Sequence, residues 1–206
     1  MIGRIVRLAA LITALAVPAA PQQRLLVLDF EILDTSGEPI DHRADHARRL
    51  GLIRDSIAQQ LADSKTYTIA DREAVRGELD AILARQFLRS CNGCELDLAR
   101  RAGADLVMLG GFHKVSTLIG RMEIAIKDAN TGEIVYARMF GFRGDTDEAW
   151  LRAARFFIDE LRRSEGARRS NEVEGGRDAI DVGGRLPAIG GLKAPYQTGS
   201  MAFNKS

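Results

Sequence analysis

Both cysteines of the chain lie in one short motif, CNGC at residues 91–94. Two thiols at this spacing can form a structural disulfide, exchange disulfides with another protein, or hold a metal ion or a covalent cofactor. The residues that follow predict a short helix over residues 95–102, with acids in its first turn and arginines in its last, as the helix dipole favours. Because a thiol at a helix start is acidified, we expect any chemistry first at this motif.

The residues around the motif favour a structural disulfide between Cys91 and Cys94. Glu95 and Asp97 place negative charge beside the second cysteine, which opposes acidification of its thiol. A helix rather than a strand is predicted before the pair, and residues 103–163 contain no proline of the kind that a thioredoxin-like site uses. Such a disulfide closes a four-residue loop and stabilises the fold by about 2 kcal/mol. A redox-active pair and a metal or cofactor site stay open as alternatives, but haem attachment is excluded because it needs histidine in place of Glu95.

Two other groups of side chains could bind a ligand. His42 and His46 are four residues apart and face the same side of a predicted helix, as a zinc or copper site requires, but a solvated helix end explains them as well. Asp29, Glu31 and Asp34 end the first predicted strand, where open α/β sheets often bind ligands. They could face a cation or an amine. No Ser-His-Asp set, phosphate loop or glycine fingerprint accompanies them, so the sequence predicts neither an enzyme nor a cofactor.

The amino-terminal segment is typical of a secretory signal peptide, over about residues 1–20. It has Arg4 and Arg7 and no acid, then the short apolar stretch 8–17, then small residues that favour cleavage after Ala19. The apolar stretch is too short for a relaxed membrane span, which needs about 20 residues. We therefore expect a periplasmic protein without a stable membrane span, in a compartment that favours disulfides, with an uncleaved anchor as the alternative.

Length and charge limit the class of protein further. The chain has 206 residues, of which 46% are hydrophobic, which suffices for one packed core. Its 29 basic and 28 acidic residues give a net charge of +1. Nucleic-acid-binding proteins usually carry a clear basic excess, so no nucleic-acid partner is predicted.

Hydrophobic periodicity predicts strands that alternate with helices and then an antiparallel hairpin. The first helix has a stripe of apolar residues at helical spacing: Ala47, Leu50, Ile53, Ile57 and Leu61. The expected strands are residues 25–30, 66–70, 105–112, 122–127 and 134–142, and the expected helices are 43–64, 72–88, 95–102 and about 147–161. This order predicts the α/β (α+β) class: a single mixed sheet of about five strands with helices packed on it, a C-terminal hairpin and a closing helix. One domain, residues 24–163, accounts for all of it, and residues 164–206 are expected to be a disordered tail.

Five motifs in this order resemble a known module: LVLDF at residues 26–30, ADR at 70–72, CNGCELDLARR at 91–101, GADLVMLGG at 103–111 and DANTGEIV at 128–135. The chain is similar to the exported α/β module of the TolB amino-terminal domain, the curli-transport lipoproteins, and the periplasmic lipoproteins that activate penicillin-binding proteins. Within that group it resembles an uncharacterised bacterial family of predicted periplasmic proteins.

The resemblance implies action by protein contacts. We expect an exported, non-enzymatic accessory protein that binds envelope proteins in an assembly. The alternative is a thiol–disulfide accessory protein that uses Cys91 and Cys94, for example in the maturation of an exported redox enzyme.

Overall fold

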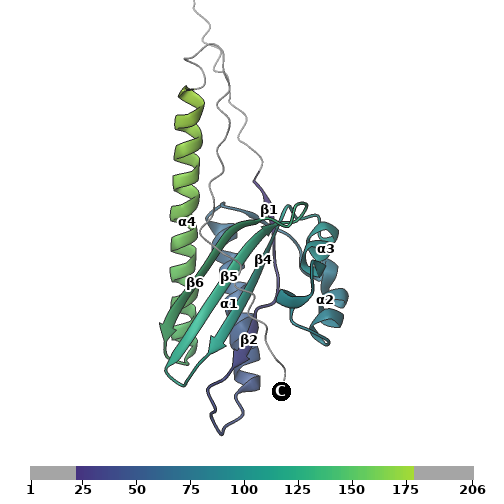
Figure 1. Cartoon of the computed structure of the whole chain (residues 1–206), viewed down its shortest axis with the longest axis vertical. Coiled ribbons are helices and arrows are strands. Elements are labelled where there is room, and N and C mark those ends of the chain that lie inside the picture. The colour runs from purple at the N-terminus through teal and green to yellow at the C-terminus, as the bar shows by residue number, and fades with distance from the viewer. Residues whose placement is uncertain (1–21, 179–206) are drawn as a thin grey trace, which may run out of the picture. The chain divides into compact units, whose positions relative to one another are not determined.

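The computed structural model describes residues 22–178 of the chain. The predicted signal peptide and the last part of the predicted tail lie outside these residues. The described part contains six strands, four α-helices and two 3₁₀ turns (Figure 1). In chain order they are β1 (Arg24–Val27), β2 (Glu31–Asp34), α1 (Arg43–Asp63), β3 (Thr68–Ile69), η1 (Glu73–Val75), α2 (Arg76–Leu83), η2 (Leu88–Ser90), α3 (Cys94–Arg101), β4 (Leu106–Lys114), β5 (Ile119–Asp128), β6 (Ile134–Arg143) and α4 (Asp147–Asp178).

The strands form one mixed sheet in the order β3-β1-β4-β5-β6, with β2 also paired to β4. The β1–β3, β1–β4 and β2–β4 pairs are parallel, and the β4–β5 and β5–β6 pairs are antiparallel. The predicted mixed α/β sheet, with its C-terminal hairpin and closing helix, is therefore confirmed, with one strand more than expected.

The additional strand arises because the first predicted strand is interrupted. Leu25 of β1 pairs with Leu106, and Glu31 of β2 pairs with Gly111. Between these two pairs the segment that joins β1 to β2 therefore contains one residue more than the matching part of β4. An extra residue of this kind is a bulge, and it shifts the alternation of side chains by one. Phe30 consequently packs in the same core as Leu25, whereas Glu31 points to the opposite face.

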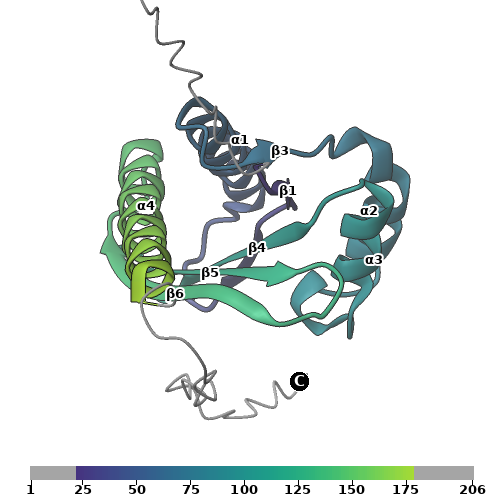
Figure 2. The ribbon, with the colours of Figure 1, turned by 90° about the horizontal axis from the view of Figure 1, so that it is seen from above.

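The sheet buries both of its faces around β4, as the continuous apolar sequence of that strand predicts. Figure 2 shows the sheet with α1 and α4 on one side and α2 and α3 on the other. Met108 and Phe112 pack against α1 and the first part of α4, and Val107 and Leu109 pack against α2 and α3. Gly110 permits the ring of Phe30 to lie on the strand, since a Cβ there would come within 2.4 Å of it.

The helices agree with the predicted stripes except at two places. In α1 the buried residue of the first turn is His46, and Ala47 is exposed. The predicted helix over residues 72–88 is interrupted: α2 ends at Leu83, and Leu88 belongs to η2. The backbone N–H of Leu88 instead donates to the buried carboxylate of Glu31 at 2.6 Å, a tertiary contact that helical periodicity does not show.

Helix α4 continues beyond the predicted end of the domain. The core side chains of α4 end at Leu161, and residues from 164 onward form a separate unit. Residues 164–178, the first part of the predicted tail, belong to this helix. Each residue added to an existing helix gains a hydrogen bond without a new nucleation cost, and an Arg168–Glu165 pair at 3.6 Å supports this extension.

Candidate functional site

The disulfide loop connects η2 to α3. Cys91 and Cys94 are joined by a disulfide, with their Cα atoms 5.6 Å apart, and α3 begins at Cys94. Between them Asn92 and Gly93 both have positive φ, +53° and +104°. Asparagine and glycine tolerate this backbone conformation best, so the two residues allow the tight loop.

Glu95 is buried directly beside the disulfide, with only 3% of its surface exposed. Its Oε2 lies 3.3 Å from the Sγ of Cys91 and accepts the Gly93 N–H at 3.1 Å. Its Oε1 accepts from the Lys127 ammonium at 2.7 Å. The sequence suggested Glu95 only as a charge at a helix start. Lys127 was missed because it is 32 residues away, on β5.

Cys91, Cys94 and Glu95 are the one group of His, Cys, Asp or Glu within residues 22–178 whose donor atoms come as close as a metal site needs. The two sulfur atoms are bonded to each other, so they offer no thiolate to a metal in this state.

The three acids predicted at the first strand end do not form one site. Asp29 is paired with Arg54 and, at 2.9 Å, with Arg72. Asp34 accepts hydrogen bonds from the backbone and hydroxyl of Ser36 at 2.9 and 2.7 Å. Because the bulge turns Glu31 to the opposite face, the three side chains diverge.

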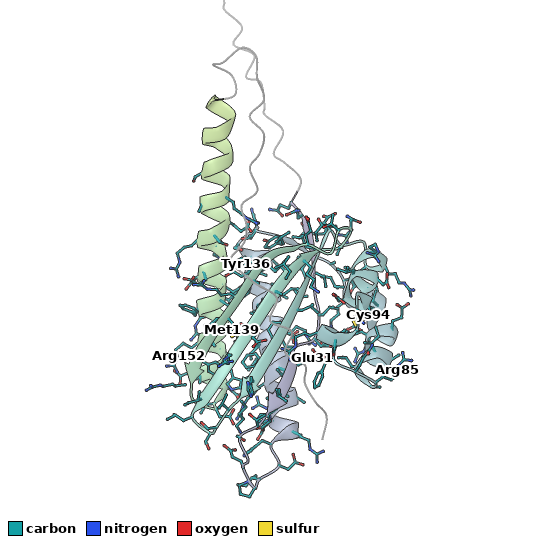
Figure 3. The ribbon with its side chains drawn as sticks, viewed as in Figure 1. Glu31, Arg85, Cys94, Tyr136, Met139 and Arg152 are labelled. Carbon is teal, nitrogen blue, oxygen red and sulfur yellow. A yellow bond between two sulfur atoms is a disulfide. The ribbon has the colours of Figure 1, made fainter. Side chains whose placement is uncertain are left out.

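Glu31 lies on the α2–α3 side of the sheet (Figure 3). Its Oε2 accepts no hydrogen bond, although the Nε of Arg89 is 3.4 Å away. Burial raises the pKa of Glu31, and the hydrogen bond from Leu88 and the charge of Arg89 offset this only in part. The guanidinium of Arg89 packs on Gly111, where a Cβ would come within 2.6 Å of it.

A second polar cluster lies where β4 ends against the first turns of α1 and α4. Lys114, 4% exposed, holds Glu38 at 2.9 Å and Asp145 at 2.8 Å. Burial raises the pKa of Asp145, but the hydrogen bond from Lys114 and the charge of Arg49 outweigh it, so the pKa lies below its usual range. The pKa of Lys114 is raised because both carboxylates outweigh its burial.

The two predicted metal ligands belong to this cluster. The Nε2 of His42 is 3.0 Å from Glu38 Oε2. His46 is 2% exposed, and its two ring nitrogens lie 3.7 Å from Asp34 and Asp145, too far for a good hydrogen bond. The ammonium of Lys114 already fills the space between the acids. The arrangement is therefore that of an ion-pair network, and among the described residues the two histidines and these carboxylates do not form a group close enough to hold a metal ion.

The network orients Trp150 of α4. The Trp150 ring stacks on Phe112 with centroids 4.3 Å apart, and the guanidinium of Arg49 lies 5.8 Å from its centroid. Arg49 also binds Asp145 and Asp147, at 2.8 and 2.9 Å. The start of α4 is thereby fixed against α1 and β4.

The lowered pKa of Asp145 and the raised pKa of Glu31 together predict that the domain is most stable in mildly acidic solution. Asp145, whose pKa is depressed from 3.8, contributes stability above that pH and loses it as the pH falls further. Glu31 acts oppositely: its pKa is raised from 4.5, so its contribution is complete below pH 4.5 and declines as the pH rises through the folded pKa. Urea unfolding between pH 3 and 8 measures this. Glu31→Gln should flatten the decline above pH 4.5 and leave the acid limb, and an unchanged profile would contradict the assignment.

The surface between β6 and α4 forms an apolar groove of about 360 Å³. The small side chains of Ala149 and Ala153 leave this space beside the aromatic rings of β6. Phe156 is 44% exposed and meets Phe140 edge to face at 5.0 Å. The lining residues are Phe140, Gly141, Phe142, Arg143, Ala149, Arg152, Ala153 and Phe156.

Two arginines accompany the aromatic residues of the groove. The side chain of Arg152 is 65% exposed, 3.7 Å from Glu148, and projects outward in Figure 3. Arg143 is exposed at the end of β6. Aromatic residues and arginine are enriched in protein interfaces relative to the rest of the surface, and the groove has this composition. Helical periodicity does not reveal this surface, because Phe156 lies on the polar side of α4, away from the buried stripe.

The fold defines the class of protein: an α/β domain with helices on both faces of a mixed sheet. Residues 23–161 match the DUF3280 family, described as a protein of unknown function (DUF2380), and the chain belongs to this family. The match spans the domain and ends where its core ends, at Leu161. No curated protein matches the chain.

Three solved structures have a similar fold. The LpoB C-terminal domain from Salmonella enterica is 14% identical with a TM-score of 0.37, over 60% of this chain and 84% of that one. Lipoprotein GNA1162 from Neisseria meningitidis is 11% identical with a TM-score of 0.44, over 70% and 96%. TolB from Acinetobacter baumannii is 8% identical with a TM-score of 0.40, over 69% of this chain and 28% of that one. The match to the family model confirms the predicted membership of an uncharacterised family.

Proposed function

We propose that this protein is an exported accessory protein that binds a protein of the cell envelope through the β6–α4 groove. The observation that carries the proposal is the half-exposed Phe156 between two arginines, over a floor of alanine side chains. A partner that inserts an apolar side chain between Phe156 and the alanine side chains would cover this apolar surface. The partner segment should also carry acidic residues, because Arg143 and Arg152 flank the groove.

Export is supported by the sequence of residues 1–20, which lie outside the described structure. A basic start, a short apolar stretch and a small-residue end are the three parts of a secretory signal peptide. None of the helices formed by residues 22–178 combines the length and the apolar character needed to cross a bilayer.

The groove can be tested by photo-crosslinking from inside it. The full chain, with its own first 20 residues and a carboxyl-terminal tag, carries benzoyl-phenylalanine in place of Phe156, or of Phe87 as the matched control. Phe87 is 48% exposed but lies outside the groove, before η2. We expect one reproducible crosslinked protein from position 156 only. Mass spectrometry of the purified chain should also find a mature end after Ala19.

Affinity for the crosslinked partner gives the quantitative test. Phe156→Ser and Arg152→Glu should each weaken binding by about thirtyfold, as removal of an interface anchor does. Phe87→Ser should leave it unchanged. Equal binding by all three variants would place the interface elsewhere and contradict the proposal.

A further inference from the structure

A buried carboxylate at the disulfide needs an explanation beyond stability. The Glu95 carboxylate is buried and pairs with Lys127, whose side chain is 25% exposed, and burying a charge costs stability that a pair of this kind only partly recovers. A disulfide that only holds a loop needs no ionised group in contact with it. Yet Oε2 of Glu95 lies 3.3 Å from Cys91 Sγ, in the one place where it can exchange a proton with that thiol.

We propose that Cys91 and Cys94 form a redox-active pair in which Glu95 is the catalytic base. This activity is separate from binding at the β6–α4 groove, which lies on other elements. The co-reactant is a disulfide or a dithiol, of another protein or of glutathione. Its reaction follows from the different surroundings of the two sulfur atoms.

Cys94 has the position of the attacking thiolate. It is the first residue of α3, an eight-residue helix, so the free backbone N–H groups and the positive end of the dipole stabilise its negative charge. Its side chain packs beside the α2–α3 core and is half-buried, which leaves one side accessible to a partner. Figure 3 shows Cys94 at the α3 end of the loop.

Cys91 has the position of the resolving thiol. The negative charge of Glu95 beside it opposes ionisation of a free Cys91, so this thiol stays protonated until its proton can be taken. Glu95 can take it, because its Oε2 lies 3.3 Å from Cys91 Sγ while Lys127 holds the other carboxylate oxygen in place at 2.7 Å. Glu95, which argues against a reactive pair from sequence alone, is therefore placed to take the proton of Cys91 at 3.3 Å, although its carboxylate also lies within 4.8 Å of Cys94 Sγ.

The reaction balances in two exchanges. The Cys94 thiolate attacks one sulfur of the partner disulfide, the partner bond breaks, and its other sulfur leaves as a thiolate. Glu95 then removes the proton of Cys91, and the Cys91 thiolate attacks Cys94 Sγ. The Cys91–Cys94 bond forms as the second partner sulfur leaves. Two electrons pass to the partner, whose two thiolates take the protons that Cys94 and Glu95 give up. The reverse sequence oxidises a dithiol with the same residues.

The test follows glutathione on each cysteine of the full chain. The protein is reduced, mixed with oxidised glutathione, quenched with acid at intervals and analysed by peptide mass spectrometry. The wild type should show a short-lived adduct on Cys94 and then the disulfide. Cys91→Ser should retain the adduct on Cys94. Glu95→Gln should resolve it at least about a hundredfold more slowly, the low end of the typical effect of losing a general base.

Asp97→Asn is the matched control, since it removes an acid of the same helix turn that is exposed and paired with Arg100. It should resolve the adduct within about twofold of the wild-type rate. Wild-type resolution by Glu95→Gln would overturn the role of the base. If that variant does not fold, the wild-type protein is treated with reduced glutathione with and without urea. A Cys91–Cys94 disulfide that is reduced only in urea is structural, and the proposal is then wrong.

Discussion

Replacement of Lys114 by methionine should lower the free energy of unfolding by about 3 kcal/mol, because it leaves two carboxylates without their shared cation. Methionine fills most of the volume of the lysine stem, so packing changes little. The charge of Lys114 is what Glu38 and Asp145 require, at 2.9 and 2.8 Å. The effect should be near the lower end of the range for broken buried pairs, since Arg49 and His42 still contact the acids. Urea unfolding at pH 7 measures it.

A double-mutant cycle separates the ion pair from other effects of the change. Asp145→Asn removes one of the two charges that Lys114 neutralises. In the Lys114→Met background this second substitution should cost at least about 1 kcal/mol less than it does alone. Strictly additive values would show that the pair contributes nothing and that the network has another purpose.

Trp150→Ala should destabilise the domain by about 3–5 kcal/mol, a large part of the total stability of a domain of this size. The indole is 2% exposed and stacks on Phe112 at 4.3 Å. Its removal leaves a cavity between α4 and β4 and takes away the surface over which Arg49 lies. Thermal and urea unfolding should both show the loss.

Phe156→Ala on the same helix is the control for this substitution. Both changes remove an aromatic ring from α4, but Phe156 is 44% exposed and contacts Phe140 only at its edge. We expect a change of less than about 1 kcal/mol in unfolding free energy. A cost close to that of Trp150→Ala would mean that Phe156 is part of the core and is not available to a partner.

Local sequence patterns were enough to predict most of the helices and strands. The apolar sequence of β4, the turn residues between β5 and β6, and the stripe of Trp150, Ala154, Phe157 and Leu161 each specify one element and its buried side. In the turn, the carboxylate of Asp128 accepts the N–H groups of Asn130 and Thr131, as its composition predicts. Such contacts join residues only a few positions apart, and so sequence spacing reveals them.

The polar sites could not be predicted in the same way. His46 looks like one of two metal ligands, but the packing of α1 against α4 buries it beside Trp150, with ring centroids 6.0 Å apart. Asp29, Glu31 and Asp34 look like one strand end, but a single bulged residue turns them in different directions. A shift of one position reverses the face of every following side chain, and the spacing of the acids in the sequence does not predict the bulge.

The CNGC motif shows most clearly which features local sequence predicts and which depend on tertiary packing. Spacing alone favours a disulfide that closes a four-residue loop before a helix, with acids after it. The roles of those acids depend on packing, because Asp97 pairs with Arg100 on the surface while Glu95 turns inward to Lys127. The difference arises from the register of β5 beside β4, which brings a lysine 32 residues away to the buried carboxylate. Contacts between residues so far apart in the sequence depend on how whole helices and strands pack, and local sequence patterns do not predict them.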